Sequence, residues 1–279
     1  MPLEPVTPSP CLHALEAEAI HALREVAARF ERPVLLFSAG KSGSVLLHLA
    51  RKAFRPAPLP FPLLHLDTGC GLREMLRFRE TVAAGPDVRM TVHPLPDGLG
   101  GSAAARATVP GGFDAAIGGD TVEGHAAAPQ AEGPDGGRDP ARRFERPPPL
   151  GAGPFGRGWA DPPAPRAGEA VPVRPLGRWA TLDLWEYIAR EGVAVMPLYL
   201  ARPRLVVERA GLLLLVDDTH FAVRPGEAVR LRSVRIASLG AAGRTGAIPS
   251  TAGDAASLLR EIREARHFPQ RQDRGGPVP

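Results

Sequence analysis

The residues best suited to chemistry form a short loop, residues 38–44, which is rich in serine and glycine and contains Lys41. It follows the apolar run 34–37, which is typical of a buried strand, and precedes apolar residues at helical spacing: Val45, Leu46, Leu49 and Ala53. The first N–H groups of a helix lack partners within it, and the helix dipole favours an anion there. This arrangement predicts a phosphate site. The alternative is a plain turn with Lys41 in solvent.

The spacing of the loop excludes one common phosphate motif. The pattern G-x-x-x-x-G-K-[ST] requires glycine at position 35, where the chain has Leu35 inside the strand. The loop instead resembles Ser-x-Gly-x-Asp-Ser, found in enzymes that split ATP between its α- and β-phosphates. Ser42 and Gly43 stand where that pattern has aspartate and serine. The positions that match it, together with a serine that some members add, are Ser38, Gly40, Lys41 and Ser44.

Two further apolar runs also end in small or polar residues. Residues 63–66 precede Asp67, Thr68 and Gly69, and residues 113–117 precede Gly118 and Gly119. In an open parallel sheet, ligands bind beyond the carboxyl ends of the strands, so we expect these residues beside the loop. Asp67 can accept a hydrogen bond from a ribose hydroxyl or an adenine amine, or else cap the helix that follows. The two glycines let a ligand approach the backbone.

The elements that must position these residues alternate between strand and helix. The chain of 279 residues is 44% hydrophobic, which suits one substantial core. We expect an α/β fold with a doubly wound, mostly parallel sheet, a long irregular insertion and a C-terminal α+β extension. Residues 12–248 are interpreted as a single domain, with 120–170 as a Pro/Gly-rich irregular insertion, and 249–279 as a helix and flexible tail. Residues 98–112 are also expected to be irregular.

Composition excludes several classes of protein. The two cysteines are far apart and form neither a disulfide framework nor a metal motif, so a reducing compartment fits. No apolar stretch reaches the ~20 residues that span a bilayer, and the N-terminus lacks a signal-peptide pattern. The net charge of +4 comes from arginines scattered among acids. We therefore expect a cytoplasmic protein with no nucleic-acid or membrane partner.

The order of several segments identifies a family. LLFSAGKSGSVLLHLARKAF, LPFPLLHLDTG, FDAAIGG, PLGRWATLDLWEYI and VMPLYLARPRLVVERAGLLLLVDD follow one another. Their order and their amino-acid sequences resemble those of the small subunit of bacterial sulfate adenylyltransferase, a relative of the phosphoadenylyl-sulfate reductases. The resemblance extends from about residue 12 to residue 247.

This resemblance implies an adenine nucleotide α-hydrolase-like domain that converts ATP and sulfate into adenylyl sulfate and pyrophosphate. It implies that Ser38, Gly40, Lys41 and Ser44 hold the phosphates, with Lys41 as a catalytic candidate. It further implies that the nucleoside is held by Asp67, Thr68, Gly69, Gly118 and Gly119. ATP carries Mg²⁺ as part of the substrate, no protein-bound metal is expected, and the partner is a larger GTPase subunit.

The departures from the family pattern all touch the phosphate region. Besides Ser42 and Gly43, residues 120–123 stand where the family has an arginine pair, and two of them are acidic. These losses support a second hypothesis, a catalytically impaired relative that acts as a nucleotide-binding or partner-binding regulatory subunit. On this hypothesis turnover is very slow because two anions must meet without enough positive charge.

Overall fold

The computed structural model describes residues 10–67, 69, 71–95, 111–121, 152–153, 156–157, 170–209, 211–216, 221–237, 239 and 246–267. Most of the two stretches predicted to be irregular, 98–112 and 120–170, lies outside these ranges. So does the predicted C-terminal tail beyond residue 267.

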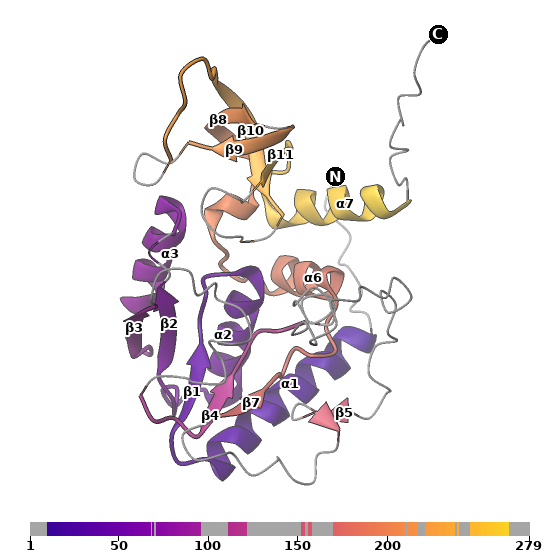
Figure 1. The fold of residues 1–279 in the computed structure, drawn as a ribbon. Helices are drawn as coiled ribbons and strands as arrows, with labels where there is room; N and C mark the ends of the chain where they lie inside the picture. Colours follow the sequence, from indigo (N-terminus) through magenta and orange to yellow (C-terminus); the bar gives the residue numbers. More distant parts are fainter. Residues whose placement is uncertain are drawn as a thin grey trace, which may run out of the picture.

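A five-stranded sheet forms the centre of the molecule, and every neighbouring pair of its strands is parallel. The spatial order is β3-β2-β1-β4-β7. The chain builds outward from β1 through β2 to β3, then continues on the other side with β4 and β7, which is a doubly wound order (Figure 1). The strands are β1 (Pro33–Leu36), β2 (Leu63–Asp67), β3 (Met90–Pro94), β4 (Ala115–Ile117) and β7 (Val171–Val173).

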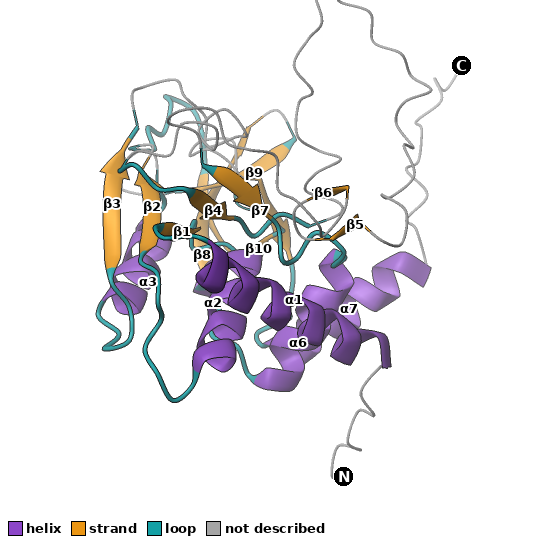
Figure 2. Cartoon of the chain, turned by 90° about the horizontal axis from the view of Figure 1, so that it is seen from below, coloured by secondary structure: helices purple, strands orange, loops and turns teal. Residues whose placement is uncertain are grey.

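Helices pack against one face of this sheet through apolar stripes that the sequence spacing predicts. α1 and α2 contact each other, α2 contacts α6, and the three helices lie together on one side of the strands (Figure 2). The cis bond Arg55–Pro56 follows α2. The helices are α1 (Pro10–Arg29), α2 (Lys41–Phe54), α3 (Arg73–Ala83), α6 (Thr181–Glu191) and α7 (Ala255–His267). None of these described helices is long and apolar enough to cross a membrane.

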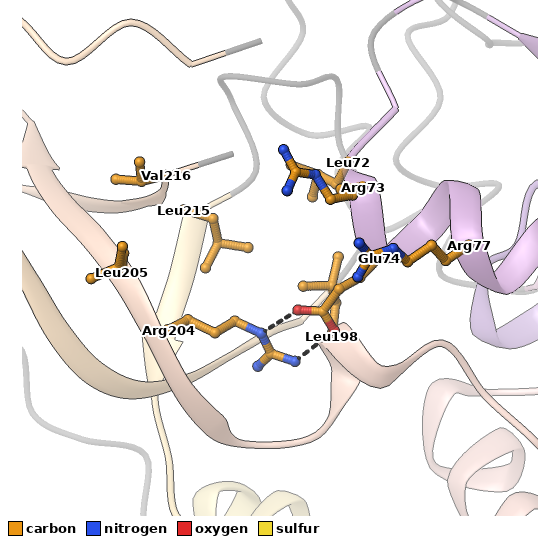
Figure 3. A pocket seen from close by; sticks show the side chains of 9 residues that line it. All are labelled: Leu72, Arg73, Glu74, Arg77, Leu198, Arg204, Leu205, Leu215 and Val216. Carbon is orange, nitrogen blue, oxygen red and sulfur yellow. Dashed lines mark hydrogen bonds and ion pairs between the residues drawn. The ribbon is translucent and has the colours of Figure 1, made fainter. Parts of the chain in front are cut away.

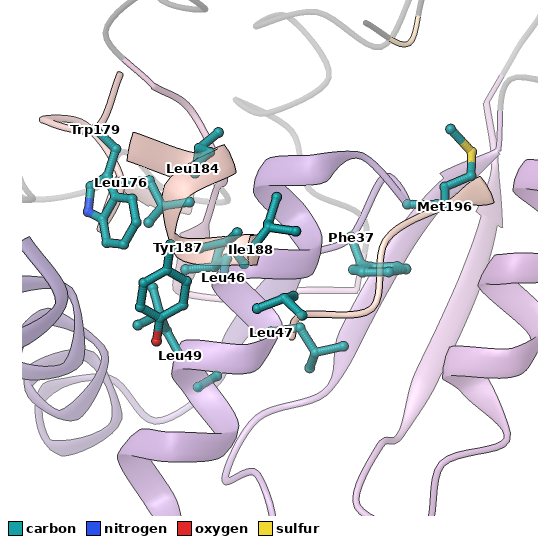
Figure 4. Close-up of a cluster of buried hydrophobic side chains, with 14 of the residues drawn as sticks. Phe37, Leu46, Leu47, Leu49, Leu176, Trp179, Leu184, Tyr187, Ile188 and Met196 are labelled. Atoms are coloured by element: carbon teal, nitrogen blue, oxygen red, sulfur yellow. The ribbon is translucent and has the colours of Figure 1, made fainter. Parts of the chain in front are cut away.

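The main hydrophobic core lies between the sheet and these helices. Phe37 continues β1 into it, Leu46 and Leu49 enter from α2, and Tyr187 and Ile188 from α6 (Figure 4). All five side chains are at most 1% exposed. A smaller cluster covers the opposite face of the sheet, with Val34, Leu64, Ala116 and Ala170. Because successive strand residues point to opposite faces, Val34 and Leu35 fall into different clusters.

A second sheet, antiparallel and closed on itself, follows in the chain and lies beyond the carboxyl edge of the first (Figure 1). Its order is β10-β11-β9-β8. The sequence indicated only a C-terminal α+β extension. The elements are β8 (Arg202–Arg209), β9 (Leu212–Leu215), β10 (Val229–Ile236) and β11 (Gly246–Pro249), preceded by the 3₁₀ turn η2 (Pro197–Tyr199). A separate pair, β5 (Ala152–Gly153) and β6 (Gly156–Arg157), completes the described strands.

Arg204 on β8 joins the two sheets. Its guanidinium donates two hydrogen bonds, of 2.8 and 3.0 Å, to the carboxylate of Glu74 on α3. It also donates to the carbonyl oxygens of Pro197, Leu200 and Val234, at 2.7 to 3.0 Å. The side chain is only 9% exposed, so one arginine ties α3, η2 and the antiparallel sheet together.

Candidate nucleotide site

The loops predicted to bind a nucleotide lie at one edge of the parallel sheet. Strands β1, β2 and β4 are neighbours and run in the same direction, so the residues that follow them emerge together. This confirms the prediction that these three loops share an edge. The sheet also changes its direction of growth between β1 and β4, and ligands in doubly wound sheets bind at such a reversal.

The loop after β1 leaves the start of α2 without a side-chain cap. Gly40 is the N-cap residue, its φ and ψ are −74° and 164°, and it has no side chain with which to cap the helix end. The preceding Ala39 is buried with a φ of +58°, a left-handed conformation that is uncommon outside glycine. Strained backbone of this kind gathers at ligand-binding loops. The N-terminus of α2 is therefore open to an anion at the predicted place.

Tyr199 from η2 reaches this helix end, and sequence reasoning did not single it out. Its hydroxyl accepts a hydrogen bond of 3.3 Å from the backbone N–H of Lys41, and the Lys41 Nζ lies 5.7 Å from the centre of its ring. Burial raises the pKa of Tyr199 to about 12, so the phenol is neutral at physiological pH. A neutral hydroxyl thus occupies one donor of the phosphate loop.

The serines of the loop differ in their surroundings. Ser38 is exposed at the end of β1, whereas Ser44 in the first turn of α2 is only 4% exposed. The Ser44 backbone N–H donates to Gly40 at 2.9 Å, but its buried Oγ has no hydrogen-bond partner within the described structure. A buried hydroxyl without a partner is costly, and a ligand oxygen is one way to satisfy it.

The glycines after β4 lie directly against the phosphate loop. A Cβ atom at Gly119 would sit 3.1 Å from the Ser42 Oγ and 3.3 Å from the Gly43 backbone nitrogen. No side chain fits there without displacing the loop. Gly118 donates its N–H to the carbonyl of Val173 on β7 at 2.8 Å, which extends the sheet by one rung. The structure therefore brings Gly118 and Gly119 to the predicted phosphate site.

Asp67 ends β2 at the same edge, but it does not cap the next helix, because the N-cap residue of α3 is Leu72. Its carboxylate accepts hydrogen bonds from the Gly69 N–H at 2.9 Å and from Arg79 at 3.0 Å. The Gly69 N–H and the guanidinium lower the pKa of Asp67, which is therefore ionised at neutral pH. These bonds fix the carboxylate as an acceptor, and Thr68 lies outside the described residues.

A further pair of charges stands at the far side of the glycines, and sequence reasoning missed the cation. Arg174 directly follows β7, and its Nε lies 3.6 Å from the carboxylate of Asp120. Asp120, one of the two acidic residues at positions 120–123, therefore has a cation beside it. The missed signal is positional: Arg174 follows an apolar strand, as Asp67 and Gly118 do.

A cavity of about 280 Å³ opens on the other side of η2 (Figure 3). It lies between α3, which contributes Arg73, Glu74 and Arg77, and the antiparallel sheet, which contributes Arg204 and Leu205. The Arg204–Glu74 ion pair is part of its lining, as Figure 3 shows. Leu198 of η2, the neighbour of Tyr199, also lines it.

Comparison with known proteins gives the family. A phosphoadenosine phosphosulfate reductase domain model matches residues 32–107. Sulfate adenylyltransferase subunit 2 of Bradyrhizobium sp. is 42% identical over 273 residues, which covers 91% of this chain and 83% of that protein. The protein of the same name from Erwinia tasmaniensis is 40% identical and covers 90% of this chain and 87% of its own length.

Among solved structures, phosphoadenylyl-sulfate reductase from Candida auris aligns with 78% of this chain and 99% of its own. Its sequence identity is 14% and its TM-score 0.42. The sequence identity to the curated proteins, over nine-tenths of the chain, decides the assignment. The chain belongs to the sulfate adenylyltransferase subunit 2 family.

Proposed function

We propose that the protein is the adenylylating subunit of a sulfate adenylyltransferase, converting ATP and sulfate into adenylyl sulfate and pyrophosphate. The observation that carries this proposal is the open N-terminus of α2, with Lys41 beside it and the unpartnered Ser44 Oγ buried in its first turn. It lies at the reversal of a doubly wound sheet, where nucleotides bind. The names of the relatives favour this function over the second hypothesis, an impaired regulatory relative.

The reaction requires no protein nucleophile. A sulfate oxygen attacks the α-phosphorus of ATP in line, the bond to the β-phosphate oxygen breaks, and pyrophosphate leaves with the electron pair. The protein must hold both anions in this geometry and offset their charge. We assign the phosphates to the α2 N-terminus with Ser38, Gly40, Lys41 and Ser44, and Lys41 is the cation that offsets charge on the transferred group.

The nucleoside is assigned to the other predicted residues of the same edge. Asp67 is held ionised by Gly69 and Arg79, so it can accept from a ribose hydroxyl or the adenine amine without reorganising. Thr68, Gly69, Gly118 and Gly119 complete this part of the site. A phosphate that takes the Lys41 N–H displaces the Tyr199 hydroxyl, which costs one neutral hydrogen bond, about 1 kcal/mol.

The other participants follow from this assignment. Within the described ranges, no three His, Cys, Asp or Glu residues lie close enough to hold a metal ion. We propose that Mg²⁺ arrives bound to ATP as part of the substrate. The relatives are named as one subunit of a pair, so we propose a large-subunit partner, specifically a GTPase, and, because the substrate is ATP, a cytoplasmic reaction.

The proposal is tested by sulfate-dependent release of pyrophosphate from MgATP, with the large subunit and GTP present. The reverse reaction, ATP formation from adenylyl sulfate and pyrophosphate, should occur at the same site. Lys41→Met should lower kcat/KM at least tenfold, since a hydrogen bond to a charged group contributes about 1.5–3 kcal/mol. Arg29→Met, which removes a cation from α1, is the matched control and should leave the rate unchanged.

Three results are informative. Turnover that depends on sulfate and on Lys41 supports the proposal. Binding of ATP without turnover in either direction supports the regulatory alternative. Turnover that survives Lys41→Met undiminished shows that the reaction does not use this loop, and the site assignment falls.

A further inference from the structure

We propose that Arg174 binds the sulfate group of the substrate, replacing the arginine pair that the sequence lacks at residues 120–123. This inference rests on the proposed function and adds to it the residue that receives the second anion. Arg174 is 57 positions after residue 117, so nothing local in the sequence connects it with the loop after β4. The pairing of β7 with β4 in the parallel sheet brings Arg174 close to that loop.

The position of Arg174 follows from the register of β7. Val173 pairs with Ile117, and its carbonyl accepts the Gly118 N–H at 2.8 Å, so Arg174 is the next residue beyond that rung. Gly119 lies two residues beyond the neighbouring strand β4, and a Cβ atom there would come within 3.2 Å of the backbone of the phosphate loop at Ser42. Neighbouring strands are about 4.8 Å apart, which puts the Arg174 backbone one strand away from the glycines that contact the loop.

The Arg174 side chain has a hydrogen-bond donor that no protein group in the described structure uses. Arg174 is 37% exposed, yet its Nε is buried and has no hydrogen-bond partner within the described structure. Asp120 is close enough at 3.6 Å to balance the charge, but too far for a hydrogen bond from Nε. A guanidinium presents planar paired donors that suit a tetrahedral oxyanion. Asp120 therefore orients the Arg174 guanidinium but leaves its Nε without a hydrogen-bond partner.

The order of the strands separates the two anions. Asp67 on β2, the loop after β1, Gly119 after β4 and Arg174 after β7 lie in that sequence along one edge. The loop already has helix donors and Lys41 for the phosphates of ATP, with Asp67 on the nucleoside side. Arg174 lies on the opposite side, where a second anion must approach and where the described residues offer another cation. We therefore assign Arg174 to sulfate rather than to pyrophosphate.

The test compares adenylyl sulfate with AMP, because the two ligands differ by the sulfate group. Calorimetric titration of the full chain should show that Arg174→Gln weakens adenylyl sulfate about 10- to 100-fold and changes AMP affinity less than twofold. Arg174→Lys keeps the charge but loses the planar pair of donors, so its affinity for adenylyl sulfate should lie between those of the unmodified protein and Arg174→Gln. Arg178→Gln is the matched control, since Arg178 pairs with Glu18, and should leave both affinities unchanged.

Two added arms separate the possible outcomes. Pyrophosphate affinity should be the same in the unmodified protein and Arg174→Gln; a selective loss of pyrophosphate instead of sulfate overturns the assignment. Asp120→Asn removes the competing carboxylate and should tighten adenylyl sulfate severalfold. Equal weakening of AMP and adenylyl sulfate in both Arg174 variants, or no weakening, also overturns it while leaving the proposed function intact. If the unmodified protein binds neither nucleotide, the proposed function itself fails.

Discussion

At the scale of single residues, the site depends on which polar atoms are already paired. The Asp67 carboxylate is held by two donors, the Tyr199 hydroxyl accepts the Lys41 N–H, and the Ser44 Oγ has no partner in the described structure. Paired groups are fixed in place, whereas an unpaired buried group favours any ligand that satisfies it. The edge thus combines a fixed carboxylate at Asp67 with an unsatisfied buried hydroxyl at Ser44.

Asp67 should make stability depend on pH. The Gly69 N–H and Arg79 lower its pKa below the unfolded value of about 3.9, so its contribution is present above that pH and disappears as the pH falls through the folded pKa. We expect Asp67→Asn to cost about 1–2 kcal/mol at pH 7 and to become equal to the unmodified protein in strong acid. Urea unfolding at pH 7, 5, 4 and 3 measures this difference.

The exposed Glu80 on α3, the helix that carries Arg79, gives the control for Asp67, and Glu80→Gln should change the free energy of unfolding by less than about 0.5 kcal/mol at every pH. A constant difference between Asp67→Asn and the unmodified protein down to pH 3 would show that its carboxylate does not stabilise the fold by ionising.

At the scale of elements, the carboxyl edge is assembled by close contact between backbones. Gly119→Ala puts a methyl group about 3.1–3.3 Å from Ser42 and Gly43, so the first turn of α2 must move. We expect nucleotide affinity to fall about tenfold, since a shift of the loop misaligns several donors at once. Gly253→Ala, where the nearest atom is 3.9 Å away, should have no such effect. Titration with ATP compares them, and equal affinities would mean that the loop accommodates the methyl group.

Helices α1, α2 and α6 are joined by a buried carboxylate. Glu16 on α1 is 7% exposed and accepts hydrogen bonds from Tyr187 at 3.1 Å and Arg190 at 2.9 Å on α6, and it also pairs with Lys52 on α2. Removing it leaves these donors inside the protein, although Glu191 still contacts both cations. Glu16 therefore holds α1 and α6 against α2, the helix that begins at the phosphate loop.

We expect Glu16→Ala to lower the free energy of unfolding by about 2–3 kcal/mol, less than the full penalty for an unpaired buried charge because Glu191 remains. Glu18→Ala on the same helix breaks the exposed pair with Arg178 and should cost less than about 1 kcal/mol. Guanidinium unfolding followed by circular dichroism measures both variants. Equal losses would mean that burial of Glu16 contributes nothing.

At the scale of the whole molecule, the relation between the two sheets depends on Arg204. The interpretation of residues 12–248 as a single domain stays a prediction, and the contacts of Arg204 with Glu74 and three carbonyls support it. Arg204→Met leaves all four acceptors without this donor and should destabilise the protein by about 3 kcal/mol or more. It should also split a single unfolding transition into two, because the parallel and antiparallel sheets then unfold separately.

The exposed Arg202 on the same strand provides the comparison, and Arg202→Met should leave one transition at nearly the original midpoint. Tryptophan fluorescence follows the main core, because Trp179 and Trp185 are buried there, while circular dichroism reports both sheets. Coincident transitions in Arg204→Met would show that other contacts couple the sheets.

Most elements of the parallel sheet, and the place of the loop predicted to bind phosphate, could be predicted from the amino-acid sequence. Apolar spacing predicted α2, short apolar runs predicted β1, β2 and β4, and the polar residues after those runs proved to share an edge. These features are local, because burial of one face imposes a period of 3.6 or 2 on neighbouring residues. The doubly wound sheet follows from them, since short strands alternating with helices pair in parallel.

Which polar groups meet depends on the path of the chain in the folded protein and could not be predicted from the sequence. Tyr199 bonds to Lys41 across 158 positions, Arg204 to Glu74 across 130, and Arg174 stands beside Asp120 because β7 pairs with β4. The closed antiparallel sheet was likewise indicated only as an α+β extension. A residue's type and neighbours tell whether it needs a partner, but the path of the chain through space selects that partner. For this reason the sequence suggested a site short of positive charge, whereas the folded chain brings Arg174 to its edge.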